Sequence, residues 1–430
     1  MLPEFNLFET VPIQLQVDKH YYQDYTPIAT IGEKQPIVIV ANGAPRQCWD
    51  LKKSYFYVRA KIVGADGADV ADATNVSVVN NTIHSMFQQI DVELNDKQVS
   101  DNNTLYGYRA YIENSLSFSK DVHESWLRAE LFIKDTAGSW ESFTREAGGT
   151  NAGLKARGTI FNGSAEVEMM GRPHTDLFLQ DKAIIPSCKL TMRFIPARDN
   201  FVLMTPAPGG GGVQVAYKLK IMDLRLYLHV LEISNSLGVA IEKMMEKVNA
   251  RYILNKNAMK IVTIPAGQTT IMQDNVYLGR LPKRITLGFV ADAAMAGGYQ
   301  QNPFNFAHFN LSQLVLNVNG EMVPSRPFTP DFTNQRYIRE FQSLYDGLRI
   351  LFSEKTLDIT FSEFAQGFLF FVFDLTPHHH SACQSQIANG NIRIEVKFAN
   401  ALAATVNMLL AAEYDALMEI DSKRNVITPY

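Results

Sequence analysis

The 430-residue sequence has few cysteines, and their spacing does not suggest a disulfide framework. Its three cysteines, Cys48, Cys188 and Cys383, are far apart and odd in number. A long chain with so few cysteines is typical of proteins made in a reducing cellular interior. The three residues are also too isolated in sequence for a local zinc or iron–sulfur motif.

An excess of charge of either sign is also missing. Lys and Arg number 40 and Asp and Glu number 44, which gives a formal net charge of −4. The first twenty residues hold a single Lys beside Glu4, Glu9 and Asp18, so no basic arm is present. This balance argues against a protein that coats nucleic acid or binds an anionic membrane through bulk charge.

Long apolar runs are absent as well. The densest ones, Gly367 to Phe373 and Ala401 to Ala412, are shorter than the roughly 20 residues needed to cross a bilayer. The N-terminus lacks the basic flank and apolar core of a signal peptide, and Leu2 excludes N-myristoylation. We therefore expect a soluble protein that is made inside a cell.

The sequence contains no catalytic signature. It has no GxSxG nucleophile elbow and no P-loop, and the tract Gly209 to Gly212 lacks the spacing of a dinucleotide-binding loop. His123-Glu124 begins like the zinc motif HExxH, but Leu127 stands where the second ligand belongs. We assign no catalytic, cofactor-binding or metal-binding residue and do not expect an enzyme.

Weaker patterns leave three alternatives open. His378 and His380 would share a face of an extended chain, with Asp374 as a conceivable third metal ligand, although a polar loop after Pro377 explains the run more simply. A sugar-binding platform is a second alternative, and a nucleic-acid patch at Lys52–Tyr57 is a third. The residues for the sugar platform would be Trp49, Trp126 and Trp140.

Strand patterning dominates the chain. Apolar and polar residues alternate along Met222 to Val230 and along Ile392 to Phe398, as expected of strands with one buried face. Further strands are predicted at Tyr55–Val63, Ile90–Leu94, Ile261–Ile264, Lys283–Val290 and Leu314–Val318. Many short strands, separated by turn signals and accompanied by few helices, predict β-sandwiches.

Helices are expected in three places. A longer one runs from Ser236 to Asn249, with Ser234 or Ser236 as its N-cap. Two short aromatic helices are expected at Tyr108–Leu116 and Tyr337–Leu344.

Three features recur in the same order at about half the chain length. The turns at Asn95 and Asn319 are 224 positions apart, and each turn joins two predicted strands. The other recurring pairs are Tyr111 with Tyr337, 226 apart, and the strand Lys189–Phe194 with Arg393–Phe398, 204 apart. This order predicts two copies of one β-rich domain in tandem.

The repeat also predicts the domain boundary. The strand after Arg393–Phe398 corresponds to Val213–Leu231, which follows the glycine tract. We therefore place the tract in a loop of the first domain and divide the chain into residues 1–231 and 232–430. For the same reason we expect Val406–Glu419 to contain a closing strand, although Ala401 to Ala412 is helical by composition.

Several long strings resemble the major capsid proteins of Polinton/Maverick elements and adintovirus-like viruses. They are spread over most of the chain and lie at His84–Ser100, Gly171–Gln180, Leu278–Val290, Asn302–Phe332, Phe371–Pro377 and Glu419–Ile427.

The resemblance implies an all-β double jelly roll of the adenovirus and tailless-phage lineage, with eight strands in each jelly roll and a few short helices. It implies homotrimeric, pseudo-hexagonal capsomers that tile an icosahedral shell, with neighbouring capsomers, penton and minor capsid proteins as partners. The implied location is the virion capsid, after synthesis in the host cell interior. The loops Asp66–Thr74 and Ala137–Gly158 would be insertions. A carbohydrate-binding or carbohydrate-active double β-sandwich protein is the alternative.

Overall fold

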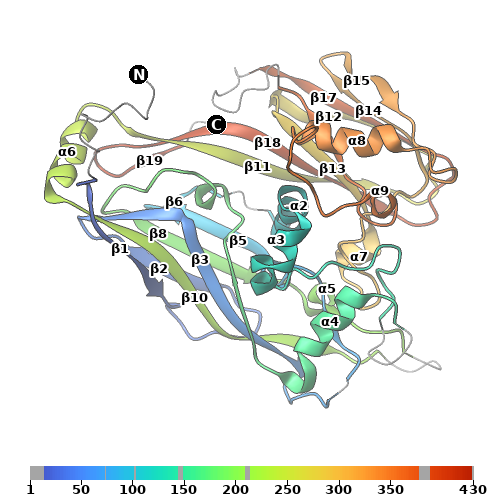
Figure 1. Ribbon diagram of the computed structural model, residues 1–430, viewed down its shortest axis with the longest axis horizontal. Coiled ribbons are helices and arrows are strands. Elements are labelled where there is room, and N and C mark those ends of the chain that lie inside the picture. Colours follow the sequence, from blue (N-terminus) through green and yellow to red (C-terminus); the bar gives the residue numbers. More distant parts are fainter. Residues whose placement is uncertain are drawn as a thin grey trace, which may run out of the picture.

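The computed structural model describes residues 14–72, 74–100, 103–143, 149–208, 214–376 and 388–428. Within these ranges the chain forms two β-sandwiches, one from its N-terminal half and one from its C-terminal half (Figure 1). The glycine tract and the His378–His380 run lie outside the described residues, as does Cys383.

The N-terminal sandwich has two four-stranded sheets. One has the order β1-β10-β3-β7, formed by Val17–Tyr25, Tyr217–Ile233, Gln47–Gly64 and Val167–Gly171. The other has the order β2-β8-β5-β6, formed by Ile37–Asn42, Lys189–Pro196, Phe87–Leu94 and Lys97–Gln98. The ring of Phe56 in β3 lies 6.2 Å from that of Phe87 and 5.5 Å from that of Phe194, so the two sheets share a core. A short pair is formed by β4 (Ser77–Val78) and β9 (Leu203–Met204).

The C-terminal sandwich repeats this plan. One sheet has the order β11-β18-β13-β16, formed by Ala250–Ile264, Val406–Ile420, Arg284–Ala291 and Phe371–Asp374, with β19 (Val426–Ile427) beside β18. The other has the order β12-β17-β14-β15, formed by Thr270–Arg280, Asn389–Phe398, Leu311–Val318 and Glu321–Phe328. Phe289 of β13 packs edge-on against Phe398 of β17, with ring centroids 5.9 Å apart.

Both halves have the same topology. Leaving β4, β9 and β19 aside and numbering the strands of each half in chain order, one sheet reads first-eighth-third-sixth and the other second-seventh-fourth-fifth. This is the connectivity of a jelly roll, in which two four-stranded antiparallel sheets close over one core. The segments that recur in the sequence occupy equivalent strands: hairpin β5-β6 matches β14-β15, and β8 matches β17.

The recurring turns have the backbone that their residues favour. Asn95 and Asp96 have φ of 50° and 61°, and Asn319 and Gly320 have 51° and 92°. Two consecutive residues with positive φ are characteristic of the type I′ turn, whose twist matches that of the flanking strands. The predicted hairpins are therefore confirmed at both places.

The helices are short. The α-helices are α1 (Thr82–Ser85), α2 (Tyr106–Ser117), α3 (Lys120–Glu124), α4 (Ala152–Ile160), α5 (Asp199–Val202), α6 (Asn235–Met245), α7 (Asp292–Ala296), α8 (Ile338–Gly347) and α9 (Phe361–Phe364). The 3-10 helices are η2 (Trp126–Glu130), η3 (Asn162–Ser164) and η4 (Asp176–Phe178). In the described part of the chain, none is longer than the 12 residues of α2.

The predicted helices and the closing strand are present, with two differences. α6 is capped by Ser234, whose hydroxyl accepts from the backbone N–H of Leu237, but it ends at Met245 instead of Asn249. The loop expected over Ala137–Gly158 contains the start of α4, because Asn151 caps the N–H of Leu154 and lets a helix begin. β10 runs on to Ile233, and the division at residues 231 and 232 stays a prediction.

The two halves share one connected core. Buried apolar side chains of both sandwiches form a single contacting cluster. Helix α2 of the first half packs against the segment before β14, where Tyr111 stacks on Phe304. Strand β11 of the second half lies along η4 of the first, where the backbone N–H of Asn257 donates to Asp176. The halves are therefore joined by packing as well as by the chain.

Candidate functional site

The metal site suggested by the histidine run is not supported by Asp374. Its carboxylate accepts from Arg349, with Nε and Oδ2 2.6 Å apart, and from the backbone N–H of Thr376. Burial by itself would raise the pKa of Asp374, but the hydrogen bonds from the Thr376 hydroxyl, from Arg349 and from the Thr376 backbone lower it overall. The carboxylate is thus engaged in closing the end of β16, and His378–His380 lie outside the described residues.

The HExxH-like segment has a structural role. His123 is buried, with Nδ1 3.0 Å from Asp358 Oδ2 and Nε2 3.2 Å from the carbonyl oxygen of Asn114. Leu127 is fully buried in the core. The segment therefore ties the first half to a carboxylate of the second.

The three tryptophans do not form a common surface. Trp49 and Trp140 are each only 1% exposed, and Trp140 Nε1 donates to the carbonyl oxygen of Gln366 at 2.7 Å. Trp126 is 53% exposed and packs edge-on against Phe118. A sugar could stack on Trp126 alone, so this grouping does not support a carbohydrate platform.

The basic stretch at Lys52–Tyr57 lies in β3, between β10 and β7. Lys52 pairs with Asp181, and Lys53 Nζ lies 3.4 Å from Asp50 Oδ2. Carboxylates therefore face both lysines, which does not favour a nucleic-acid patch.

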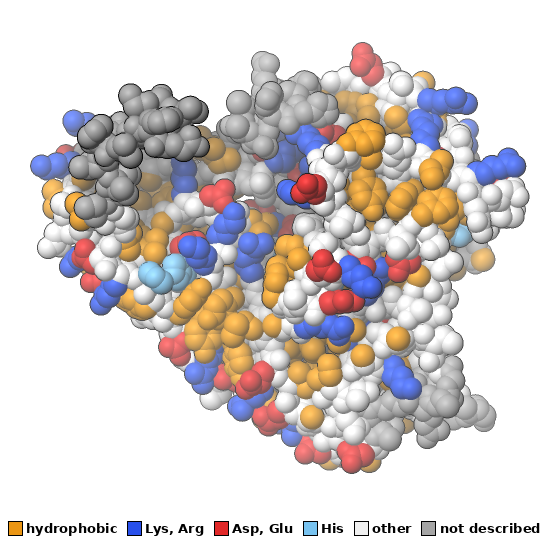
Figure 2. Space-filling view, viewed as in Figure 1, with side chains coloured by type: hydrophobic (Ala, Val, Ile, Leu, Met, Phe, Trp, Pro, Cys, Tyr) orange, Lys and Arg blue, Asp and Glu red, His pale blue; other side chains and the backbone are white. Residues whose placement is uncertain are grey.

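An aromatic strip crosses the outer face of the β1-β10-β3 sheet. Tyr55 stacks on Tyr227 at 5.2 Å, and Tyr22 lies 5.1 Å from Tyr55 and 5.0 Å from His229. His20 extends the strip at 5.3 Å from His229. Figure 2 shows histidine and hydrophobic side chains gathered over this part of the N-terminal half. Tyr22 is 48% exposed, so the strip presents apolar surface to solvent.

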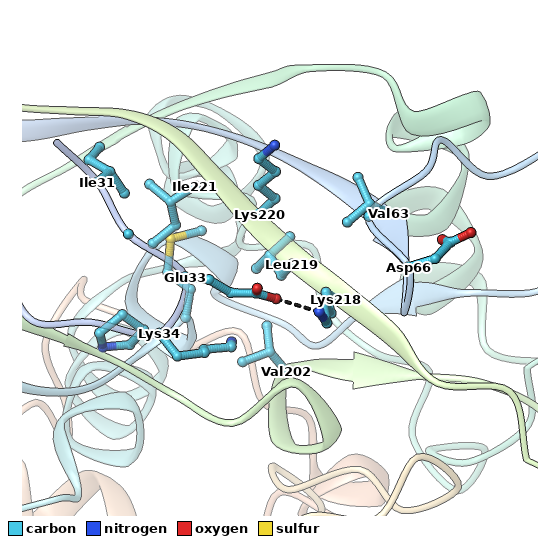
Figure 3. Close-up of a pocket in the computed structure, with 14 residues that line it drawn as sticks. Ile31, Glu33, Lys34, Val63, Asp66, Val202, Lys218, Leu219, Lys220 and Ile221 are labelled. Carbon is cyan, nitrogen blue, oxygen red and sulfur yellow. Dashed lines mark ion pairs between the residues drawn. The ribbon is translucent and has the colours of Figure 1, made fainter.

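A cavity of about 310 Å³ lies at the end of β3 and β10, beneath the loop before β2 (Figure 3). Glu33 and Lys218 form an ion pair of 2.6 Å across it, and that hydrogen bond lowers the pKa of Glu33. Lys34 is paired with Asp199 at 2.8 Å. Apolar side chains supply much of the remaining wall, including those of Ile31, Val63, Val202, Leu219 and Ile221. The cavity therefore combines an ion pair with largely apolar walls.

The most unusual group of side chains is buried beneath α2. His84 of α1, Glu130 of η2 and His174 after β7 each place a nitrogen or oxygen atom within 4.8 Å of the others. Their exposures are 0%, 3% and 4%. Asn114 of α2 donates to Glu130 Oε2 at 2.9 Å. Burial lowers the pKa of His84.

An ion-pair chain continues from this group toward the second half. Arg109 Nε lies 2.8 Å from Glu113 Oε1, and Arg109 Nη2 lies 2.6 Å from Asp176 Oδ1. Burial by itself would raise the pKa of Glu113, but Arg109 and His174 lower it to about 2. Asn257 of β11 donates to Glu113 Oε1 at 3.0 Å. The network thus connects the interior of the first jelly roll to the second.

Sequence reasoning does not single out this network. His84 and His174 lie in strings that carry the capsid-protein resemblance, but neither has a nearby ligand at a metal-binding spacing. Glu130 is 46 positions from His84.

Comparisons at the level of sequence identify a distant relative of the chain. No family model matches the chain. An uncharacterized protein of Caenorhabditis elegans is 22% identical over 406 residues, which cover 91% of this chain and 93% of that protein. No helix of the described residues is long and apolar enough to span a membrane.

Three solved structures are similar over nearly the whole chain. A chain in the structure of the Sputnik virophage has a TM-score of 0.67 at 12% identity, covering 100% of this chain and 92% of its own length. The Faustovirus major capsid protein has a TM-score of 0.59 at 9% identity, and the match covers 96% of this chain and 92% of that protein's chain. The mavirus major capsid protein has a TM-score of 0.55 at 9% identity, and the match covers 99% of this chain and 92% of that protein's chain. With the topology above, they confirm the predicted all-β double jelly roll with few short helices.

Proposed function

We propose that this chain is a major capsid protein, a structural subunit and not an enzyme. The observation that carries the proposal is the pair of topologically identical jelly rolls, in a chain that matches viral major capsid proteins over almost its entire length. A repeated sandwich gives one polypeptide two similar sets of lateral edges. Three copies around a three-fold axis then present six similar sides, which suits a hexagonal lattice.

The proposed assembly is a homotrimeric, pseudo-hexagonal capsomer that tiles an icosahedral shell. Its partners are two further copies of the chain, neighbouring capsomers, and penton and minor capsid proteins. We place it in the virion capsid after synthesis in the host cell interior. The near-neutral charge of −4 suits a shell protein that encloses a genome without condensing it.

We also infer membership of the Polinton/Maverick and adintovirus-like lineage, with domains at residues 1–231 and 232–430. The sequence strings that resemble those capsid proteins support this lineage. A host protein derived from an integrated element is a variant of the same proposal. Genes for a packaging ATPase and a capsid protease beside the coding sequence would favour an intact element.

The proposal is tested on the purified full-length chain by light scattering coupled to size exclusion. A trimer has about three times the 48.3 kDa chain mass, or about 145 kDa. Negative-stain images should show three-fold capsomers with a hexagonal outline, and particles where they assemble. A stable monomer at high protein concentration that forms no lattice would contradict the proposal.

No observation favours the carbohydrate alternative. Trp49 and Trp140, two of the three tryptophans expected to form the platform, are buried, and of the three only Trp126 is exposed. Binding to a glycan array that is abolished by Trp126→Ala would revive it.

A further inference from the structure

The group formed by His84, Glu130 and His174 has the donor set and spacing of a metal centre. In a tetrahedral zinc site with bonds of 2.0–2.1 Å, neighbouring ligand atoms are about 3.3 Å apart. His84 Nε2 and Glu130 Oε2 are already 3.2 Å apart, and all three ligand atoms lie within 4.8 Å of one another. A small inward movement of His174 would complete the triangle.

Both imidazoles are held by their other ring nitrogen. Nδ1 of His174 lies 2.6 Å from Glu113 Oε2, and Nδ1 of His84 lies 2.9 Å from the hydroxyl of Tyr106. Each bond leaves Nε2 as the nitrogen available to a metal. Metal-bound histidines usually have such a partner, often a carboxylate, which fixes the ring orientation and increases the basicity of the ligand.

A glycine leaves room for the carboxylate. A Cβ atom at Gly171 would lie 3.0 Å from Glu130 Oε1, within the distance that real Cβ atoms rarely tolerate. With glycine there, both Glu130 oxygens can face the histidines. Bidentate binding by Glu130 would bring the ligand atoms to four, the usual number for a closed zinc site.

The charge of Glu130 also calls for a cation. Glu130 is 3% exposed, and among the described residues its carboxylate is contacted by His84 and by the neutral side-chain amide of Asn114. With both imidazoles neutral, as metal binding requires, neither of these two partners offsets the carboxylate charge. Uncompensated buried charge is costly, and a divalent cation bound by Glu130 would offset it.

We propose that His84, Glu130 and His174 bind one divalent transition-metal cation of the zinc type. Imidazole nitrogen with carboxylate oxygen suits Zn²⁺, whereas Ca²⁺ and Mg²⁺ prefer oxygen ligands throughout. The site is buried, so the cation binds as the chain folds and its binding free energy adds to folding. Through Glu113 and Asn257, it also supports the contact between the two jelly rolls.

The experiment measures zinc in a parent chain, defined as the full-length chain with His378–His380 changed to alanine, so that this run cannot bind the metal. The parent is refolded with excess Zn²⁺ and dialysed, and its metal content is measured by mass spectrometry. We expect one zinc per chain and a loss of at least tenfold in affinity in His174→Ala. Reconstitution with Co²⁺ should give the strong visible absorption of a four-coordinate site. A refolded parent without zinc would overturn the proposal.

Matched variants separate this site from others. His229→Ala disrupts a second histidine pair, in which Nδ1 of the exposed His20 lies 3.3 Å from Nε2 of the buried His229. This variant should leave the zinc content at one per chain. Zinc lost in His229→Ala and retained in His174→Ala would place the metal at the His20–His229 pair and overturn the proposal.

Two further variants address folding. His174→Cys keeps a zinc ligand at this position and should retain the metal. Gly171→Ala keeps all three ligands but crowds Glu130, so it should bind zinc at least tenfold more weakly. A chelator should lower the Tm of the parent but not that of folded His174→Ala. Equal chelator sensitivity in the two would contradict the site. All these measurements use the isolated chain, so they stand or fall independently of capsid assembly.

Discussion

The ring of Tyr111 in α2 stacks on that of Phe304, with centroids 4.3 Å apart and an interplanar angle of 13°. Both rings are fully buried, and the two residues belong to different jelly rolls. The contact therefore joins the two halves through their common core.

Phe304→Ala should destabilise the whole chain. Truncating a buried phenylalanine typically costs about 3–5 kcal/mol through lost transfer free energy and the cavity that remains. The free energy of unfolding from urea titration measures the effect. Phe352→Ala is the control, because Phe352 is 96% exposed and its loss should cost less than about 0.5 kcal/mol. Equal effects of the two substitutions would show that Phe304 does not join the halves.

Arg157→Met should be as damaging as Phe304→Ala. Arg157 and Asp135 form an ion pair of 2.6 Å with both side chains 0% exposed. Removing the guanidinium leaves a buried carboxylate without its charge partner, which costs about 3–5 kcal/mol. Unfolding in guanidinium chloride measures the loss. The pair of Lys19 and Glu232, with side chains 61% and 24% exposed, offers the comparison, since Lys19→Met should cost less than about 1 kcal/mol.

The carboxylate of Asp358 should make stability depend on acid pH. Its burial raises the pKa, but His123 and Lys134 lower it overall below the model-peptide value of 3.8. A lowered folded-state pKa contributes stability that is present above the unfolded-state pKa and lost as the pH falls through the folded-state pKa. Lys134 also pairs with Glu363, whose pKa is lowered too, although its burial opposes the shift.

The measurement is the unfolding free energy between pH 7 and pH 3. Asp358→Asn should reduce stability at pH 7 and flatten the decline below about pH 4. Asp181→Asn serves as control, because that carboxylate is 81% exposed and the substitution should leave the profile in place. An Asp358→Asn profile parallel to that of the parent would refute the link to His123 and Lys134.

Gly367→Ala should be far more harmful than Gly267→Ala. Both glycines have positive φ, 110° and 83°, so each substitution introduces backbone strain. A Cβ at Gly367 would also lie 1.9 Å from Trp140 Nε1, whereas at Gly267 it would meet nothing within 4 Å. The clash should add at least about 2 kcal/mol to the strain, measured as the difference between the two Tm-derived stabilities. Similar losses would mean that Trp140 moves aside freely.

The strands and their order of repetition could be predicted because they depend on local patterns. Ile392, Ile394 and Val396 point into the core and their polar neighbours outward, as the period of two requires. Asn319-Gly320 favours positive φ at both turn positions, so the hairpin is readable from the residues themselves. Ala401–Ala412 shows the limit of composition, because Val406 onward pairs with β11 as a strand despite its helical propensity.

The buried network depended on the tertiary structure. His84, Glu130 and His174 come from α1, η2 and the segment after β7, and no local spacing relates them. Likewise, the burial of Trp49 and Trp140 and the exposure of Trp126 follow from where the fold places each residue: Trp49 in β3, Trp126 at the start of η2, and Trp140 in the segment before α4.

The sequence by itself determined two tandem copies of one β-rich unit, because alternation, turn chemistry and internal repetition act over a few residues or are visible as order along the chain. Only the tertiary structure decided which distant side chains converge, such as Tyr111 on Phe304 or His84 on Glu130. The physical reason is that convergence arises from the packing of whole elements in a shared core, where burial and pairing are settled together.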